Sequence, residues 1–332
     1  MAVLITGGTG FVGLNLAEAL LERGEQVVLF DLREPPSAFV ASIGGNSARM
    51  RCVVGDVRHP TDLQQAFSGG DITEVFHGAV ITSGAARELA NPGSIVAVNL
   101  TGTLNVLKAA SARSVRRFVF PSSVSVYGES LFDRETVNEA DTPAVPEGLY
   151  GVTKYAAERA ALRLGKLWGL EVIVGRIGNV FGPWEGETGV RDLITPLAQI
   201  AAAAVHGKQV VLPDVRLRRD LIYSRDLARL LVTLLDAKAP GFSTYNLSVE
   251  ADWSDIYVRW CRVVGGQFGE FDWRVAQAGE ISTIDYHDTR SRARMDTARV
   301  RADLGFAPAF PPDLALEDYA RWLNATADYF VA

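Results

Sequence analysis

A glycine-rich turn close to the N-terminus constrains the fold of this chain more than any other feature. Residues 3–6 form a short apolar run, and Gly7, Gly10 and Gly13 follow at regular intervals. Residues 14–23 then have the periodicity of an amphipathic helix. In a strand, turn and helix of this kind, glycines permit a tight turn, close approach of the backbone to a pyrophosphate, and close packing of helix on strand. The sequence therefore predicts a dinucleotide-binding unit.

The helix start and the next strand supply further contacts for a dinucleotide. The first helical amides, at Phe11 and Val12, lack partners within the helix and are expected to bind the pyrophosphate. Residues 26–30 form a second apolar strand, and Asp31 closes it about twenty residues after the turn. Its carboxylate would accept hydrogen bonds from the ribose hydroxyls and repel a 2′-phosphate, which predicts NAD rather than NADP. Arg33 lies close enough to leave the use of NADP open.

Apolar segments continue to alternate with helical ones after the second strand. Strands are expected at residues 51–54, 74–77, 117–121 and 171–176, and helices at residues 95–112 and 150–167. This alternation predicts an α/β fold with a Rossmann-type, doubly wound parallel sheet. We expect residues 1–178 to form this NAD-binding domain, with part of the later chain returning to it. Residues 179–332 should form mainly a smaller C-terminal α/β substrate-binding region. Residues 35–47, rich in glycine, proline and serine, are expected to form a surface loop.

Tyr150 and Lys154 share a face of the helix expected at residues 150–167. At this spacing their Cβ atoms lie roughly 5–6 Å apart. A free tyrosine, with a pKa of about 10, is a poor base at neutral pH, but a neighbouring cation favours the phenolate. Ser122 or Ser123, at the end of a predicted strand, could provide a hydroxyl that orients the reacting group. Such a pair also occurs by chance on solvated helices, so its meaning depends on the rest of the chain.

Together these motifs resemble the extended short-chain dehydrogenase/reductase family, in its nucleotide-sugar epimerase and dehydratase branch. The resemblance covers nearly the whole chain, from the glycine turn through Asp31 to the segment at residues 176–183. It implies hydride transfer between C4 of a nicotinamide and a carbinol carbon of the substrate. Tyr150 would be the acid/base, Ser123 would hydrogen-bond the same oxygen, and Lys154 would bind the nicotinamide ribose and lower the pKa of Tyr150.

The resemblance also implies the remaining contacts with cofactor and substrate. The additional cofactor-binding residues would be Asp56, Val57, Ala79 and Asn99, together with Tyr150 and Lys154 themselves. The expected substrate contacts, besides Ser123, are Asn179, Arg191, Arg219 and Arg292. Arg219 lies in an Arg-Asp-aromatic motif, and Arg292 stands for a cluster of arginines of which one would reach a substrate diphosphate. Arg191, in a helix expected at residues 190–205, could pair with a substrate carboxylate. His77 is interpreted as a hydrogen-bonded core residue.

Departures from the family pattern narrow the expected reaction. Val124 and Ser125 occupy positions where related 4,6-dehydratases carry Asp-Glu, so dehydration is disfavoured, and decarboxylating relatives carry a glutamate in place of Ser125. The expected function is therefore NAD-dependent epimerisation of a nucleotide sugar through a transient keto intermediate. The acid-rich loop at residues 182–189 and the missing glycine turn at residues 212–214 favour an alternative, dehydrogenation of a free sugar, polyol or sugar acid. A non-catalytic, NAD-sensing protein is a further alternative.

Composition limits the partners and the compartment. A net charge of −6 argues against a nucleic-acid partner, and the 2 cysteines and 4 histidines show no metal-ligand spacing, so no metal is expected. No run of about 18 apolar residues predicts a membrane span. We expect a cytoplasmic protein that binds a small-molecule sugar or nucleotide sugar. A homodimer formed by the helices at residues 95–112 and 150–167 is expected from the resemblance.

Overall fold

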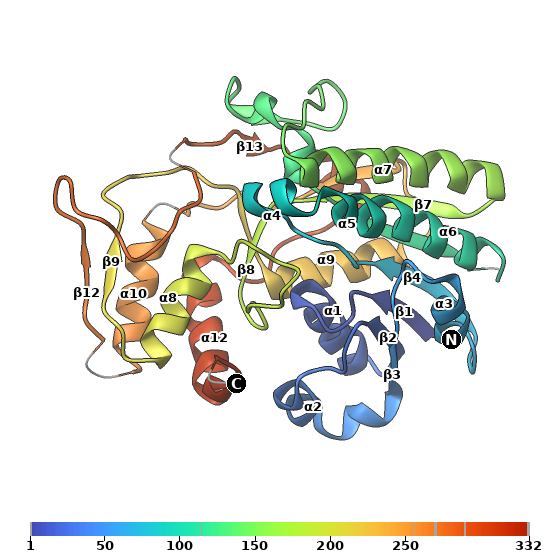
Figure 1. The fold of residues 1–332 in the computed structure, drawn as a ribbon, viewed down its shortest axis with the longest axis horizontal. Helices are drawn as coiled ribbons and strands as arrows, with labels where there is room; N and C mark the ends of the chain where they lie inside the picture. Colours follow the sequence, from blue (N-terminus) through green and yellow to red (C-terminus); the bar gives the residue numbers. More distant parts are fainter. Residues whose placement is uncertain (1, 114, 254, 269–270, 289, 331–332) are drawn as a thin grey trace.

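The computed structural model describes residues 2–113, 115–253, 255–268, 271–288 and 290–330. Within these residues the main sheet has seven parallel strands (Figure 1). In spatial order they are β11 (Thr244–Leu247), β7 (Glu171–Ile177), β5 (Arg117–Ser123), β4 (Ile72–His77), β1 (Ala2–Thr6), β2 (Gln26–Asp31) and β3 (Met50–Val54). The strand order reverses between β1 and β4, and ligands of such sheets bind at the carboxyl ends of the strands beside that point. The predicted α/β fold with a doubly wound parallel sheet is confirmed.

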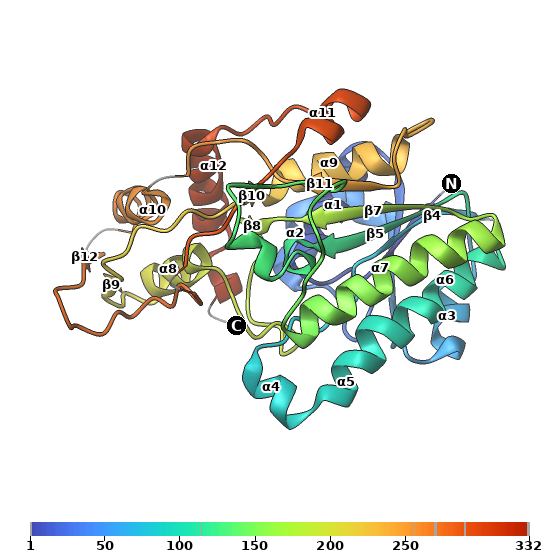
Figure 2. The same ribbon diagram turned by 90° about the horizontal axis from the view of Figure 1, so that it is seen from above.

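Helices cover both faces of the sheet because every inner strand is apolar on both sides. Val3 and Ile5 of β1 face the core shared with α1 (Phe11–Glu22) and α9 (Ser224–Asp236). Ala2 and Leu4 face the opposite core, which α3 (Pro60–Ala66), α6 (Thr103–Ser111) and α7 (Leu149–Trp168) close. Figure 2 shows the sheet between these two layers. Alternate residues of one strand thus anchor both layers.

The second region lies to one side of the sheet in Figure 1 and combines helices with short strand pairs. Its helices are α8 (Pro196–Val205), α10 (Ile256–Gly265) and α12 (Pro312–Ala325). The parallel pairs are β8 (Asn179–Phe181) with β10 (Leu221–Tyr223), and β9 (Val210–Leu212) with β12 (Trp273–Val275). A further pair, β6 (Thr136–Val137) with β13 (Arg294–Met295), joins a loop of the first half to the C-terminal part of the chain. The shorter helices are α2 (Ser37–Ile43), α4 (Ala85–Ala90), α5 (Pro92–Val96) and α11 (Ala298–Leu304).

The structure corrects the expected surface loop and two of the expected helices. Residues 35–47 contain α2, whose Phe39 and Ile43 lie one turn apart and are buried in the core. The helix expected at residues 95–112 is interrupted by the π-helical turn Ala97–Gly102. The helix expected from residue 190 begins only at Pro196, where the side chain of Thr195 caps it by accepting a hydrogen bond from the amide of Ala198. Residues 190–195 are instead available to line a site.

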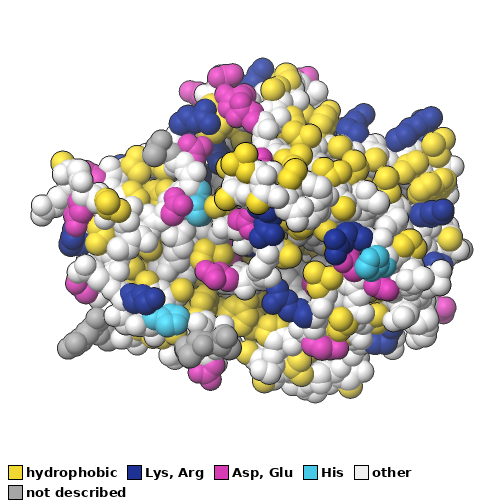
Figure 3. Space-filling model, in the orientation of Figure 1, with side chains coloured by type: hydrophobic (Ala, Val, Ile, Leu, Met, Phe, Trp, Pro, Cys, Tyr) yellow, Lys and Arg dark blue, Asp and Glu magenta, His cyan; other side chains and the backbone are white. Residues whose placement is uncertain are grey.

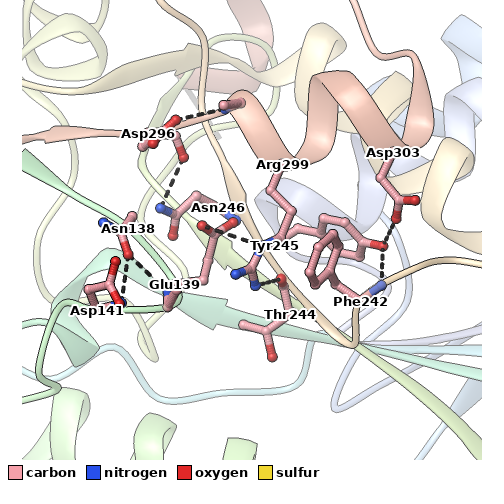
Figure 4. Close-up of polar contacts among 12 residues, drawn as sticks. Asn138, Glu139, Asp141, Phe242, Thr244, Tyr245, Asn246, Asp296, Arg299 and Asp303 are labelled. Carbon is pink, nitrogen blue, oxygen red and sulfur yellow. Dashed lines mark hydrogen bonds and ion pairs between the residues drawn. The ribbon is translucent and has the colours of Figure 1, made fainter.

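A cluster of polar contacts holds the long segment between β5 and α7 against the end of the sheet (Figure 4). Asn246 of β11 accepts a hydrogen bond at Oδ1 from the hydroxyl of Tyr127 (2.7 Å). Its Nδ2 donates to the carbonyl oxygens of Val137 (3.3 Å) and Asp296 (3.1 Å), and its backbone amide donates to Glu139 Oε1 (2.7 Å). One buried amide therefore ties together the segment after Ser123, the edge strand and the C-terminal part of the chain.

The surface carries charge of both signs. Figure 3 shows basic and acidic side chains interspersed over the face it presents. Across the described residues, no helix is both apolar enough and long enough to cross a lipid bilayer.

Candidate active site

The glycine turn packs so closely that side chains would not fit at its ends. Gly7 has a φ of +67°, and a Cβ atom there would lie 2.6 Å from the amide nitrogen of Ala79. At Gly13 a Cβ atom would lie 2.3 Å from the carbonyl oxygen of Gly7. Gly10 is different, because its nearest obstacle would be the oxygen of Gly7 at 3.3 Å. Its outer side is therefore open, as close approach of a pyrophosphate requires.

The start of α1 has the properties of an anion site. The helix begins at Phe11, and no side chain caps it. The amides of its first turn therefore lack intrahelical partners, and the helix dipole adds partial positive charge. Val12 lines the cavity that also contains Tyr150. The amides at Phe11 and Val12 would hold the pyrophosphate of a dinucleotide.

Asp31 lies beside the glycine turn, where its carboxylate would accept hydrogen bonds from the ribose of a bound dinucleotide. Its Oδ2 accepts a hydrogen bond from the amide of Thr9 (3.0 Å), and its Oδ1 accepts one from Leu32 (2.7 Å). Arg33, whose charge left the use of NADP open in the sequence, donates a hydrogen bond to the carbonyl oxygen of Thr188. The structure thus places a carboxylate next to the turn and engages the nearby guanidinium elsewhere.

The other predicted cofactor residues fall into two groups. Asp56 and Val57 are buried after β3, and Arg58 Nε donates to both oxygens of Asp56 (3.0 and 2.9 Å), which holds the pKa of that carboxyl below its usual value. Ala79 adjoins Gly7 of the glycine turn. Asn99 is also buried (2% exposed), and its side chain is hydrogen-bonded within the protein.

The side-chain amide of Asn99 forms its hydrogen bonds within the protein. It accepts from the amide of Ile81 (2.8 Å) and donates to the carbonyl of Ile81 and the hydroxyl of Thr153 (both 3.0 Å). Its role is therefore to hold the segment after β4 against α7, because a buried amide must be paired within the core.

Ser123, Tyr150 and Lys154 line one cavity of about 480 Å³. The hydroxyl of Ser123 accepts a hydrogen bond from the amide of Ser125 (3.1 Å) and donates one to the hydroxyl of Ser125 (3.2 Å). Ser122 points elsewhere, donating to Glu158 Oε2 (2.7 Å) in the interior. Both serines line the cavity, but the hydroxyl of Ser122 is engaged by Glu158, which leaves Ser123 as the serine available to a substrate beside Tyr150.

The electrostatics of Tyr150 differ from our expectation. We expected Lys154 to lower its pKa, but burial raises the pKa of the Tyr150 hydroxyl. The hydrogen bond from Ser123, the charge of Arg191 and a hydrogen bond with Thr82 oppose that rise. The loss of hydration when a phenol is buried outweighs these contacts, because it penalises the charged form.

The side chain of Lys154 packs against β5 where it lines the cavity. Its Nζ lies 4.4 Å from the ring centroid of Phe120, and the residue is 4% exposed. Burial lowers the pKa of Lys154 to about 7, against the opposing effect of Glu158. His77 lies nearby and is held by Thr6 (2.6 Å) and Thr103 (2.9 Å), as expected for a core histidine. Burial lowers its pKa to about 3, so the ring is neutral.

The predicted substrate residues line the same cavity from the second region. Asn179, Arg191, Arg219 and Arg292 all contribute to its wall. Arg219 donates to the carbonyl oxygens of Arg290 (2.5 Å) and Asp288 (2.9 Å), and burial lowers its pKa. Arg292 Nη2 lies 3.6 Å from Asp288 Oδ2. The cavity therefore runs from the glycine-turn helix past Tyr150 to a cationic wall.

The acid-rich loop at residues 182–189 does not present all of its charge to this cavity. Glu185 is completely buried, and its oxygens accept hydrogen bonds from Arg191 Nη2 (2.8 Å), the amide of Thr195 (2.9 Å) and the hydroxyl of Thr195 (2.6 Å). Its charge is compensated, so this carboxylate gives no reason to exclude a phosphorylated substrate.

Sequence reasoning missed Thr82, which also lines the cavity, and it named Arg290 only as a member of the arginine cluster represented by Arg292. Thr82 lies five residues after His77, the last residue of β4. The argument that polar residues gather at the carboxyl edge of the sheet would have included it. Arg290 lies 3.5 Å from the ring centroid of Phe132, a contact between distant segments that no local pattern indicates.

Comparison with known proteins agrees with this geometry. The sequence profile of the NAD dependent epimerase/dehydratase family matches residues 3–248. UDP-glucose 4-epimerase of Neisseria gonorrhoeae is 28% identical over 346 residues, covering 98% of each chain. Short-chain dehydrogenase/reductase family 42E member 1 of Homo sapiens is 35% identical over 167 residues, or 48% of this chain. That match spans only 39% of the human protein.

Solved structures show the same fold over nearly the whole chain. UDP-glucose 4-epimerase of Thermotoga maritima, solved with UDP-glucose, has a TM-score of 0.78 at 22% identity, covering 98% of this chain and 100% of that one. MoeE5, solved with UDP-glucuronic acid and NAD, has a TM-score of 0.75 at 25% identity, covering 97% and 98%. NAD is also bound in the similar UDP-glucuronic acid 4-epimerase of Bacillus cereus (TM-score 0.74, 22% identity, 97% of both chains). The chain therefore belongs to the NAD-dependent epimerase/dehydratase family of extended short-chain dehydrogenases/reductases, and it is an enzyme with NAD as its cofactor.

Proposed function

We propose that this enzyme epimerises a nucleotide sugar through a transient keto intermediate. One observation carries the proposal: a single cavity joins the start of α1, the Ser123, Tyr150 and Lys154 side chains, and a wall that contains Arg219 and Arg292. A sugar beside Tyr150 would then have its diphosphate near the guanidinium groups, which bind phosphate oxygens well.

In the proposed reaction the protein handles the proton and the orientation of the sugar. Tyr150, as phenolate, takes the proton of the reacting hydroxyl, and Ser123 donates a hydrogen bond to the same oxygen. NAD supplies the acceptor for the hydride and afterwards its donor. The keto sugar must turn within the cavity before Tyr150 returns the proton, so that the hydride reaches the other face. Lys154 would hold the nicotinamide ribose.

A second candidate is the NAD-dependent dehydrogenation of a sugar acid. Arg191 lines the cavity on the Tyr150 side, where it could pair with a carboxylate. Its Nη2 is already bound to Glu185, however, which weakens this reading. Epimerisation is favoured because further arginines lie at the opposite wall.

The two reactions differ in what happens to the cofactor. An epimerase returns its hydride, so purified protein with bound NAD should convert a UDP-sugar without added NAD and without net NADH. A dehydrogenase should form one NADH for each sugar consumed. The measurement is NADH absorbance together with product chromatography over UDP-sugars, free sugars and sugar acids. Stoichiometric NADH would contradict epimerisation.

Tyr150→Phe tests whether the site is catalytic at all. We expect a loss of about 10²–10⁴-fold in turnover, because the acid/base is removed. NAD affinity should remain, since the glycine turn and Asp31 are untouched. Unchanged turnover would contradict the role of Tyr150 and favour a protein that only senses NAD.

Assembly, compartment and the limits of the domains are also proposals. We propose that the protein is cytoplasmic and forms a homodimer through α6 and α7. Val152 and Leu167 of α7 are 41% and 57% exposed and would contribute to that interface. We also propose the division at residue 178, with α9 and β11 returning to the NAD-binding domain. Light scattering that showed a monomer would contradict the dimer.

A further inference from the structure

The loop between β8 and α8 has a buried base and an exposed tip. At its base Trp184 and Glu185 are completely buried. The two carboxylate oxygens of Glu185 accept hydrogen bonds from the amide (2.9 Å) and the hydroxyl (2.6 Å) of Thr195. Residues 186–194 between them are exposed or half-buried. The bonds between Glu185 and Thr195 therefore close the ends of a compact surface loop.

One side of this loop is attached to the segment that follows β4. The amide of Thr82 donates to the carbonyl oxygen of Val190 (2.9 Å), and the amide of Asp192 donates to the carbonyl oxygen of Thr82 (3.1 Å). These bonds make a parallel β-bridge between Thr82 and Arg191. Asp192 also accepts, at Oδ2, a hydrogen bond from the amide of Gly84 (3.0 Å).

An ion pair with Arg87 of α4 adds to these attachments. Its Nε lies 2.9 Å from both carboxylate oxygens of Asp192, and its Nη2 lies 2.5 Å from Oδ1. The same Nη2 donates to the carbonyl oxygen of Gly189 (2.9 Å). A guanidinium that meets a carboxylate through two nitrogens makes directional bonds that are stronger than those between neutral groups. This Arg87–Asp192 pair, the latch, holds the tip of the loop.

The opposite side of the loop is attached to the segment that follows β2. Arg33, two residues after that strand, donates to the carbonyl oxygen of Thr188. In the sheet, β1 lies between β2 and β4. A loop that is bonded to both segments therefore crosses the carboxyl end of β1, where the glycine turn begins. The guanidinium of Arg191 lies 5.4 Å from the ring centroid of Phe11, the first residue of α1, which agrees with this path.

This path places the loop over the part of the site that suits the cofactor. The pyrophosphate of a dinucleotide would bind at the start of α1, beneath the loop. A dinucleotide held there can leave only when the attachments at the tip break. These attachments should break before those at the base, because they are exposed and hold few apolar contacts.

We propose that residues 186–194 form a strap over the bound dinucleotide, and that the latch sets the rate at which NAD is taken up and released. The proposal requires NAD as the cofactor, but it does not depend on whether the reaction is epimerisation or dehydrogenation. A strap of this kind suits an enzyme that returns its hydride to the sugar, since its cofactor need not be exchanged between turnovers.

The test is the rate at which NADH, the fluorescent form of the cofactor, leaves the protein when excess NAD displaces it in a stopped-flow experiment. Asp192→Asn and Arg87→Met each remove one charge of the latch, and each should raise this rate about three- to tenfold. Glu187→Gln removes a charge from an exposed position of the same loop and should leave the rate unchanged. The double variant should release NADH no faster than the faster single variant, because both substitutions break one contact.

The association rate separates a strap from an ordinary cofactor contact. Opening the strap should also speed binding, so the Kd for NADH should change less than the release rate. An unchanged release rate, an unchanged association rate or multiplied effects in the double variant would overturn the proposal. Exchanging the two charges, with Arg87→Asp and Asp192→Arg together, should slow release again, which a general loosening of the loop would not do. Release is measured without substrate, so its outcome is independent of the tests of the proposed function.

Discussion

The residues that line the cavity with Tyr150 come from parts of the chain that are far apart in sequence. Ser123 ends β5, Thr82 follows β4, and Arg191 precedes α8. They converge because parallel strands place their carboxyl ends along one edge of the sheet, where loops can carry polar groups. Burial of the phenol raises the pKa of Tyr150, and Ser123, Arg191 and Thr82 oppose that rise.

Asp31 should decide between the two forms of the dinucleotide. Asp31→Asn removes the negative charge but keeps a side-chain oxygen for the amides of Thr9 or Leu32. We expect weaker NAD binding and a smaller preference over NADP, because a 2′-phosphate is no longer repelled. Calorimetric titration of both cofactors gives the ratio. An unchanged ratio would contradict the role assigned to this carboxylate.

His77 should make stability depend on acidity. The folded protein keeps the ring neutral down to about pH 3, whereas the unfolded chain protonates it near about 6.5. Between these values the unfolded state binds more protons, so stability falls as pH falls below about 6.5, by about 1.4 kcal/mol for each unit.

The matched variant for this effect is His77→Gln. It should be less stable at neutral pH, because hydrogen bonds with Thr6 and Thr103 are disturbed. Between about pH 6.5 and about pH 5 it should lose about 2 kcal/mol less of its unfolding free energy than wild type. Urea unfolding at both pH values measures this difference. Parallel curves for the two proteins would show that another group controls the acid response.

The sequence pointed to candidate residues where a chemical motif is local. The glycine turn, Asp31 and the spacing of Tyr150 and Lys154 are such motifs; the structure places Asp31 against the turn, and Tyr150 and Lys154 in the cavity that Val12 also lines. The buried ion pair of Glu185 with Arg191 could not be identified in this way, because the burial of Glu185 depends on the fold. The electrostatics of Tyr150 also required the structure, since burial is not a local property.

At the scale of elements, the glycine turn offers a matched pair of substitutions. Gly13→Ala would force a Cβ atom to 2.3 Å from the oxygen of Gly7, so α1 must shift from β1. Gly10→Ala meets the same oxygen only at 3.3 Å. We therefore expect Gly13→Ala to lower the melting temperature and NAD affinity together, and Gly10→Ala to lower mainly NAD affinity. Equal melting temperatures for both variants would contradict this assignment.

Elements were predictable where burial follows a simple period. Most strands of the main sheet are apolar runs, and the six strands expected between residues 3 and 176 are present and parallel. The helix α2 was missed because its glycine- and proline-rich neighbours indicate a loop, while Phe39 packs on Trp184 at 5.3 Å, far along the chain. Residues 190–195 were assigned to a helix because an apolar periodicity continues through them, although Thr195 and Pro196 are good helix-start residues.

At the scale of the whole molecule, Asn246 should couple stability to catalysis. Asn246→Ala leaves the hydroxyl of Tyr127 and the carbonyl of Val137 without their partner in the interior, which costs about 1–3 kcal/mol for each unpaired group. We expect a lower melting temperature and a raised KM, because the segments that carry Ser123 and the arginine wall both loosen. Asn324→Ala, on the exposed side of α12, is the control. Loss of stability with normal kinetics would show that the two are independent.

The last strand of the main sheet comes from the second half of the chain, since β11 pairs with β7. A gene shortened after residue 178 would therefore encode a sheet whose outermost strand has bare backbone groups along one side. Such an edge invites pairing with another molecule. The two halves should consequently be inseparable in the test tube, and the N-terminal half expressed alone should precipitate unless a strand supplied in trans completes it.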